Sequence, residues 1–182
     1  MKIRKVTDDN FAKVVALLRA AFPDSDYEAQ LVQNLHEHGK SIHEWVCIHT
    51  NKIIAYIAFS NAYNGRKVCG LHLGPLAVNP EFQQQGVGSE LLRYALTQEP
   101  VKSSPIFVLG DPLFYQRFGF TPCTMPICSF AKNNTHFLSL GNTTTTPFTV
   151  GYEAEFGNRP PAPPSARTPS ALSTPVSGVR SS

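Results

Sequence analysis

The feature that most constrains the fold is a strand that leads through a glycine-containing turn into a helix. It occupies residues 73–96, LGPLAVNPEFQQQGVGSELLRYAL. The first backbone amides of a helix have no partners within the helix and point out of its N-terminus. Glycine allows positive φ angles and a close approach of the backbone to a ligand, and Gly86 and Gly88 stand at this turn. The segment therefore predicts a phosphate cradle built from backbone N–H groups.

Other nucleotide-binding turns fit this segment poorly. A P-loop requires Gly-Lys-Ser/Thr at its end, whereas this turn ends with Gly86-Val87-Gly88-Ser89. A dinucleotide fold requires GxGxxG directly after the first strand of a βαβ unit, but this turn lies in the middle of the chain and lacks the third glycine. From the residues alone, a turn that only shapes the loop before a helix stays open as an alternative.

Further strands and helices alternate around this segment. Apolar residues recur on one helical face from Phe11 to Phe22, and Asp8 or Asp9 is in position to cap that helix. We expect strands over residues 2–6, 43–49, 53–60, 68–78, 106–109, 136–140 and 148–152, and helices over about 8–22, 24–39, 88–100 and 112–117. This pattern predicts one mixed α/β domain, residues 1–156, with helices flanking a mixed sheet.

The last residues of the chain have a different composition. Residues 157–182 consist mainly of Pro, Ser, Ala and Thr and show no apolar periodicity. Such a segment cannot bury enough apolar surface to offset the entropy of ordering it, so we expect a disordered tail. A proline-rich ligand for a partner protein is the alternative interpretation of the tail.

Charge and hydropathy exclude several classes of protein. Residues 1–156 hold equal numbers of basic and acidic residues, and the net charge of +3 comes from three arginines in the tail, so we expect no nucleic-acid partner. The chain has no apolar run near the length of about 20 residues that spans a membrane, and no membrane partner is expected. An N-terminus without an apolar signal segment indicates a cytoplasmic protein.

The cysteines and histidines do not form a metal-binding pattern. Four cysteines are too few for a disulfide scaffold, and we expect thiols. Cys123 and Cys128 lack a second pair, and neither His36-Glu37-His38 nor His43-Glu44 completes HExxH. The sequence therefore predicts no metal cofactor.

Two motifs together resemble a known family. The segment Gln83-Gln84-Gln85-Gly86-Val87-Gly88 resembles the Q/R-x-x-G-x-G/A signature of the GNAT superfamily of N-acetyltransferases. The residues before it, 76–82 (LAVNPEF), resemble the strand and turn that precede this signature, and FVLGDPLFYQRFGF, residues 107–120, resembles the family's next motif. The pairing of LGPLAV with LGDPxxYxRFGF resembles the YhbS-like branch. The resemblance covers residues 1 to about 156.

The resemblance implies a fold and a cofactor site. The fold would be a splayed central sheet flanked by helices, with acetyl-CoA as co-substrate bound where two strands separate. Gly74-Pro75 fits this splay, because proline lacks a ladder donor and glycine tolerates a bulge, so strand pairing should fail there. The cofactor-binding residues would be those of the strand and the turn: Leu76, Ala77, Val78, Gln83, Gln84, Gln85, Gly86, Val87, Gly88 and Ser89. Backbone amides from Gln84 to Ser89 would hold the pyrophosphate, and the backbone of Leu76–Val78 would pair with the pantetheine arm as an added strand.

The resemblance also implies a reaction, the direct attack of a primary amine on acetyl-CoA in a ternary complex. A backbone N–H near Leu76–Val78 would polarise the thioester carbonyl. Tyr115 would protonate the departing thiolate; the alternative for Tyr115 is a packing role beside Phe114, Phe118 and Phe120. Where the family often has an asparagine, this chain has Gly110-Asp111-Pro112, and Asp111 is expected to cap the short helix instead.

The base and the acceptor stay open at this point. His72 and Glu44 are candidates for the base, and a water chain to bulk is the alternative to both. Asp24, Asp26 and Glu28 could attract a cationic amine, although acidic residues are also expected at a helix start. The acceptor would be a small-molecule or peptide amine, and a homodimer is compatible with such a domain. A catalytically silent acyl-CoA-binding module is the alternative function.

Overall fold

The computed structural model describes residues 1–130 and 135–157. Its elements are β1 (Lys2–Lys5), α1 (Asp8–Ala21), α2 (Tyr27–Glu37), β2 (Ile42–His49), β3 (Lys52–Asn64), β4 (Lys67–Val78), η1 (Pro80–Phe82), α3 (Val87–Leu96), η2 (Val101–Ser103), β5 (Ile106–Leu109), α4 (Pro112–Tyr115), η3 (Gln116–Phe118), β6 (Thr121–Pro122), β7 (Ile127–Cys128), β8 (Phe137–Leu140), β9 (Thr149–Val150) and η4 (Ala154–Phe156). The predicted tail, apart from Gly157, lies outside the described residues.

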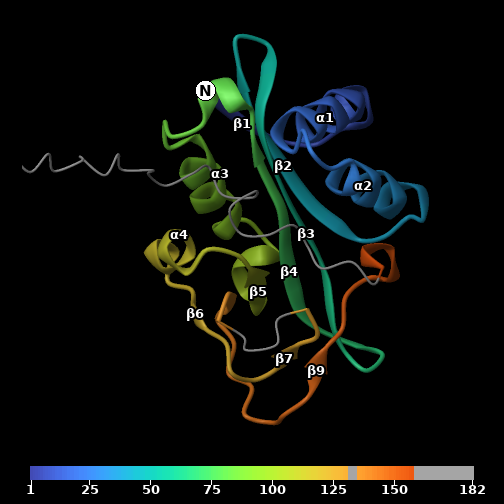
Figure 1. Ribbon diagram of the computed structural model, residues 1–182, viewed down its shortest axis with the longest axis vertical. Helices are drawn as coiled ribbons and strands as arrows, with labels where there is room; N and C mark the ends of the chain where they lie inside the picture. The colour runs from blue at the N-terminus through green and yellow to red at the C-terminus, as the bar shows by residue number, and fades with distance from the viewer. Residues whose placement is uncertain (131–134, 158–182) are drawn as a thin grey trace, which may run out of the picture.

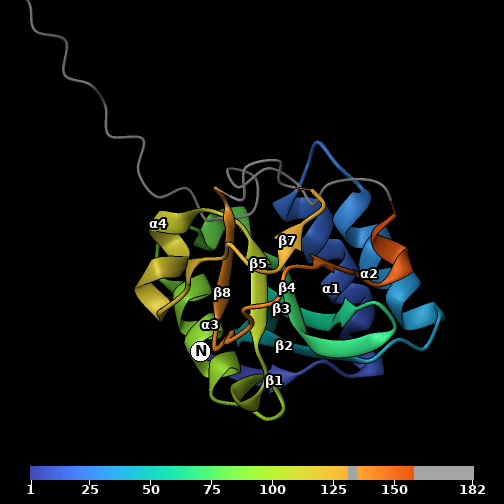
Figure 2. The same ribbon diagram turned by 90° about the horizontal axis from the view of Figure 1, so that it is seen from below.

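A mixed sheet of seven strands, in the order β1-β2-β3-β4-β5-β8-β6, forms the centre of the fold. Its neighbours pair antiparallel, except that β4 and β5 run parallel. Helices α1 and α2 cover one face and α3 covers the other (Figures 1 and 2). The predicted mixed α/β fold with helices flanking the sheet is therefore confirmed.

Side chains alternate between these two faces, as the period of two in a strand requires. On β3, Ile57 packs towards α3, whereas Tyr56 and Ala58 pack beneath α1 and α2. Because helices cover β3 on both faces of the sheet, its sequence is an almost continuous apolar run.

Two predicted elements differ from the structure. The N-cap of α1 is Thr7 rather than Asp8 or Asp9, because Thr7 is extended and its N–H donates to Oδ1 of Asn10 at 3.0 Å, as in a capping box. The strand expected over residues 148–152 is reduced to β9, which pairs with β7 in a separate two-stranded sheet. The predicted strand over residues 136–140 is confirmed as β8, which joins the main sheet beside β5.

Candidate active site

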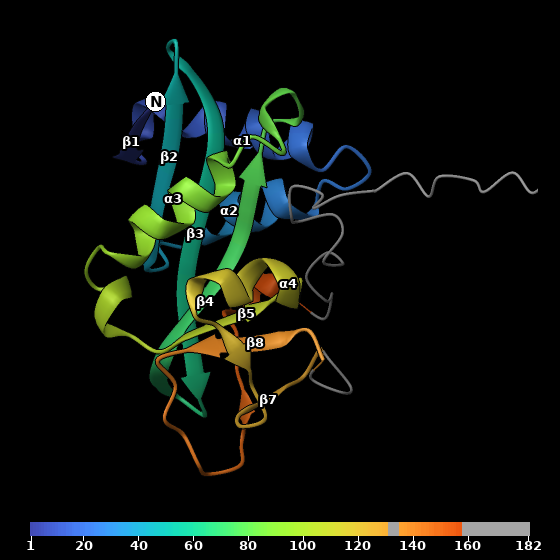
Figure 3. The ribbon, with the colours of Figure 1, turned by 90° about the vertical axis from the view of Figure 1, so that its left-hand side faces the viewer.

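Strands β4 and β5 separate halfway along β4. They pair only where Leu71–Leu73 faces Ile106–Val108, while β4 continues to Val78 (Figure 3). At the separation, the β3–β4 register shifts from Leu73 opposite Phe59 to Leu76 opposite Ile57, so that Gly74-Pro75 forms a bulge. The predicted loss of pairing at Gly74-Pro75 is confirmed. Within the described residues, β4 beyond Leu73 has no strand partner on its β5 side.

The backbone of this unpaired edge has a definite orientation. The N–H of Asn79 donates to the carbonyl of Ile54 on β3 at 2.8 Å, and successive residues of a strand turn their backbone groups to opposite sides. Ala77 therefore faces β3, whereas Leu76 and Val78 face the splay. Consistent with this, Nε2 of Gln83 donates to the carbonyl of Val78 at 3.1 Å. The N–H groups of Leu76 and Val78 are thus the donors that this edge directs into the splay.

The glycine turn places free amides at the start of α3. Gly86 is the N-cap of α3 with φ of 79°, a left-handed conformation that favours glycine. The first amide bonded at this end of the helix is that of Glu90, which donates to the carbonyl of Gly86 at 3.0 Å. The helix therefore offers no acceptor to the amides of Val87, Gly88 and Ser89.

Individual residues of the turn differ in what they contribute. Gly88 is helical and buried, and it is not at positive φ. Gln84 has φ of 60° instead. The side chain of Gln85 donates to the carbonyl of Glu81 at 3.0 Å, and with Gln83 bound to Val78 both amides hold the turn in shape.

Arg117 is a site residue that the sequence reasoning missed. It lies on η3, and its Nη2 donates to Oγ of Ser89 in the first turn of α3 at 3.2 Å. Its guanidinium lies 5.6 Å from the ring centroids of both Phe114 and Phe118. The signal for it was an arginine set among aromatic residues in the motif that contains Tyr115. A cation at the positive end of a helix is unfavourable unless an anion binds there.

Tyr115 is the last residue of α4, and its ring packs against Gly110, which follows β5. Only 2% of the residue is exposed, and its ring contacts Phe114 and Phe120 edge-on, with centroids 5.0 and 5.5 Å apart. A Cβ added at Gly110 would overlap this ring, so the chain needs glycine there. Asp111 caps α4 as predicted, since its Oδ1 accepts the N–H of Leu113 at 2.9 Å.

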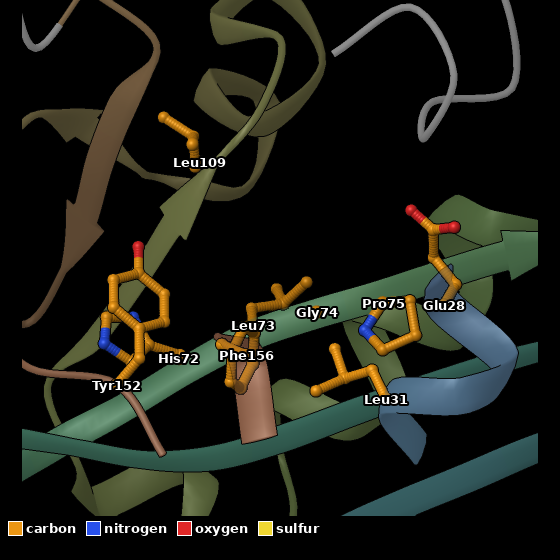
Figure 4. A pocket seen from close by; sticks show the side chains of 9 residues that line it. All are labelled: Glu28, Leu31, His72, Leu73, Gly74, Pro75, Leu109, Tyr152 and Phe156. Carbon is orange, nitrogen blue, oxygen red and sulfur yellow. The ribbon is translucent and has the colours of Figure 1, made fainter. Parts of the chain in front are cut away.

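A small pocket opens where the bulge of β4 faces α2. Its volume is about 10 Å³, and it lies between the two sides of the splay (Figure 4). The lining residues come from α2, β4, the end of β5 and the segment after β9: Glu28, Leu31, His72, Leu73, Gly74, Pro75, Leu109, Tyr152 and Phe156. Leu109 immediately precedes Gly110, so the pocket and the ring of Tyr115 adjoin the same end of β5.

Comparison with known proteins shows which family has this arrangement. Residues 40–122 match the acetyltransferase (GNAT) domain family. The uncharacterised N-acetyltransferase YhbS of Escherichia coli K12 is 35% identical over 108 residues, which cover 58% of this chain and 64% of YhbS. The chain thus spans less than two thirds of that relative's length. The uncharacterised N-acetyltransferase YjhQ of the same strain is 34% identical over 102 residues, covering 53% of this chain and 56% of YjhQ.

Solved structures agree with the sequence match. The crystal structure of Escherichia coli YhbS in complex with CoA has a TM-score of 0.76 and 26% identity, covering 85% of this chain and 91% of that one. A GNAT acetyltransferase from Brucella melitensis in complex with acetyl-CoA has a TM-score of 0.72 and 26% identity, and the match covers 85% of this chain and 97% of that one. Residues 40–122 of this chain therefore match a GNAT acetyltransferase domain, and its fold is similar to that of YhbS. The predicted resemblance to that family and to YhbS is confirmed.

The two candidates for a base in the GNAT domain have different surroundings. His72 is 2% exposed, donates from Nε2 to the carbonyl of Gly151 at 3.0 Å, and stacks on Tyr152 with centroids 3.6 Å apart. Burial lowers the pKa of His72 to about 4, which the bond to Gly151 only partly opposes. His72 therefore lines the pocket as a neutral imidazole and is a weak base.

Glu44 is engaged on the α1–α2 face of the GNAT domain. Its Oε2 accepts the hydroxyl of Tyr56 at 2.7 Å, and its Oε1 lies 2.9 Å from Nε2 of His36. Burial, followed by the charge of Glu44, raises the pKa of Tyr56 well above its usual value. These contacts give Glu44 a structural role, and it is not among the residues that line the pocket.

The other polar residues singled out in the sequence do not converge on one site. His38 bonds Glu155 at 2.9 Å, whereas His36 pairs with Glu44. All four cysteines are free thiols. Among residues 1–130 and 135–157, no group of three or more His, Cys, Asp or Glu side chains could hold a metal, and no helix is long and apolar enough to cross a membrane.

Proposed function

We propose that this domain transfers an acetyl group from acetyl-CoA to a primary amine, by direct attack within a ternary complex. The observation that carries the proposal is Arg117, whose guanidinium lies at the N-terminus of α3 beside Ser89. The helix dipole disfavours a cation there, and a bound anion removes the penalty. The pyrophosphate of CoA is an anion of the right kind, and the similar YhbS structure contains CoA.

The turn before α3 would hold the phosphates through its backbone. The helix offers no acceptor to the amides of Val87, Gly88 and Ser89, so these would bind the phosphates together with the amides of Gln84 to Gly86. Arg117, beside Ser89, would add a charge-assisted hydrogen bond. Gln83 and Gln85 would act indirectly, because their side chains brace the turn rather than extend from it. The binding site would thus depend on backbone geometry fixed by Gly86.

The unpaired edge of β4 would receive the pantetheine arm as if it were another strand. Leu76 and Val78 direct N–H groups into the splay, whereas Ala77 spaces them apart. One of these two N–H groups would donate to the thioester carbonyl oxygen and stabilise the negative charge that develops there as the amine attacks. The bulge at Gly74-Pro75 ends the edge beside the pocket, so the acetyl group would lie where an acceptor can reach it.

Tyr115 would supply the proton that the thiolate needs. As the amine nitrogen bonds to the carbonyl carbon, the carbon–sulfur bond breaks, and the phenol donates its proton to sulfur. The proton that the amine loses returns to solvent, from which Tyr115 is reprotonated. A phenol with a pKa of about 10 and a thiol of about 8.5 are close enough for useful transfer.

The test is turnover of acetyl-CoA against polyamines, amino acids, aminoglycosides, simple alkylamines and peptide N-termini, with product identified by mass. We expect acetylated product from at least one class, and loss of it in Tyr115→Phe. The alternative, an acyl-CoA-binding module without turnover, has one observation in its favour, because the ring of Tyr115 is buried against Phe114 and Phe120 as in a packing residue. CoA binding with no product from any amine would establish that alternative.

A further inference from the structure

Among the described residues that line the pocket beside Gly74-Pro75, one side chain is acidic. Of the three acids at the start of α2, Asp26 is exposed and pairs with Arg19 at 2.8 Å, and Asp24 is also exposed. Glu28 is fully buried and lines the pocket. In Figure 4 the carboxylate of Glu28 and the hydroxyl of Tyr152 stand at opposite ends of the pocket and point to the same side of β4. The structure therefore selects Glu28 from the three acids that the sequence left equivalent.

The other side chains that line the pocket restrict which groups a cationic ligand can carry besides its positive charge. Apolar side chains come from Leu31 on α2, Leu73 and Pro75 on β4, Leu109 on β5 and Phe156 on η4. His72 is neutral and uses Nε2 on Gly151. A second ammonium or a set of hydroxyls placed against these side chains would lose hydration without gaining partners. A single cationic head on an apolar body meets no such penalty.

The size of the pocket points to the same kind of ligand. A cavity of about 10 Å³ is at the lower limit for one water-sized group. An ammonium head has that size, so the head would enter and the apolar body would lie along Leu109 and Tyr152, the lining side chains that are partly exposed.

We propose that this pocket is the acceptor site, and that Glu28 binds the ammonium head of a primary amine carried on a compact apolar body. Polyamines and aminosugars are then poor acceptors. The position of the acetyl group beside this pocket is part of the proposed function, so this inference rests on that function. Glu28 is a binding residue, and the proton that the nitrogen loses before attack is not assigned to it.

The experiment uses the full chain saturated with CoA, with leucine methyl groups labelled by ¹³C and assigned by mutation. n-Butylamine is titrated while the methyl signals of Leu31, Leu73 and Leu109 are followed, and 1-butanol is the uncharged probe of matching shape. Glu28→Gln keeps the size of the side chain and removes its charge. Asp24→Asn is the matched control, because it makes the same charge change four residues away on an exposed acid.

We expect saturable shifts at these methyl groups with n-butylamine in wild type and in Asp24→Asn. The dissociation constant for n-butylamine should be about 10- to 150-fold larger in Glu28→Gln, the range for a hydrogen bond to a charged group. In wild type, 1-butanol should bind more weakly than n-butylamine by the same factor. Absence of saturable shifts in wild type, equal affinity in Glu28→Gln, or equal affinity for 1-butanol would each overturn the inference. The comparison of n-butylamine with 1-butanol needs only wild type, so it decides the matter even if Glu28→Gln does not fold.

A parallel turnover assay separates this inference from the proposed function. If n-butylamine binds as expected and acetyl-CoA yields no N-butylacetamide, the site stands and the proposed transfer fails. If the product forms while the three methyl groups do not respond, the transfer stands and the acceptor binds elsewhere.

Discussion

Arg117→Ala tests whether the start of α3 is an anion site. The variant removes the guanidinium that donates to Ser89 and lies 5.6 Å from the ring centroids of both Phe114 and Phe118. Arg117 is exposed, so its contact with a phosphate is screened, and we expect a loss of about 1–2 kcal/mol in binding, or about 5- to 30-fold in Kd for CoA. Calorimetry at two salt concentrations measures this, and the salt dependence of binding should also weaken.

Arg93→Ala is the matched control for this variant. Arg93 also lies over the ring of Phe118, with its guanidinium carbon 5.3 Å from the centroid, but it is in the last turn of α3. Loss of a cation–π contact of about 0.5–1 kcal/mol is therefore common to both variants, whereas loss of a cation at the phosphate end occurs only in Arg117→Ala.

The stability of the CoA-free protein should change little in Arg117→Ala. Removing a cation from the positive end of a helix gains about 0.3–1 kcal/mol, which offsets the lost ring contact. The reasoning is refuted if CoA affinity is unchanged in Arg117→Ala, or if Arg93→Ala weakens it equally. A Tm lowered by more than about 4 °C, the upper range for 1 kcal/mol in a domain of this size, would show that Arg117 is mainly structural.

Three further variants test other parts of the site. Gly86→Val should weaken CoA binding by about 5- to 30-fold, since φ of 79° strains a branched residue by about 1–2 kcal/mol. Gly39→Val, at φ of 61° with equal open space, should leave the affinity measured by calorimetry unchanged. Tyr115→Phe should lower kcat by about 10²–10⁴-fold with CoA affinity retained, and turnover within threefold of wild type would make Tyr115 a packing residue only. His72 binds a proton less readily in the folded state, so the free energy of unfolding should fall by up to about 3 kcal/mol as pH drops from about 6.5 to 4. Chemical denaturation of His72→Gln should show a smaller decrease over this range. An equal decrease would contradict the lowered pKa of His72.

The glycine turn was predictable because its determinants are local. A strand, a turn and a helix that follow one another within residues 73–96 fix their own geometry, and the left-handed φ at Gly86 favours glycine whatever surrounds it. The bulge at Gly74-Pro75 and the cap at Asp111 were predictable for the same reason. The cap of α1 was not, because Thr7, Asp8 and Asp9 are all good caps and only the extended backbone of Thr7 selects one.

The sequence by itself therefore determined the glycine turn, the order of the elements and the resemblance to the GNAT family. Only the tertiary structure decided which polar residues share a site, because those contacts join residues far apart in the chain. Arg117 meets Ser89 across 28 positions, and His72 meets Gly151 across 79. Glu28 lies close in sequence to Asp24 and Asp26, yet of these three acids only Glu28 lines the pocket. It does so because the packing of α2 beside the bulge of β4 buries one face of that helix. Helical periodicity predicts that a face will be buried, but what that face meets depends on the fold as a whole.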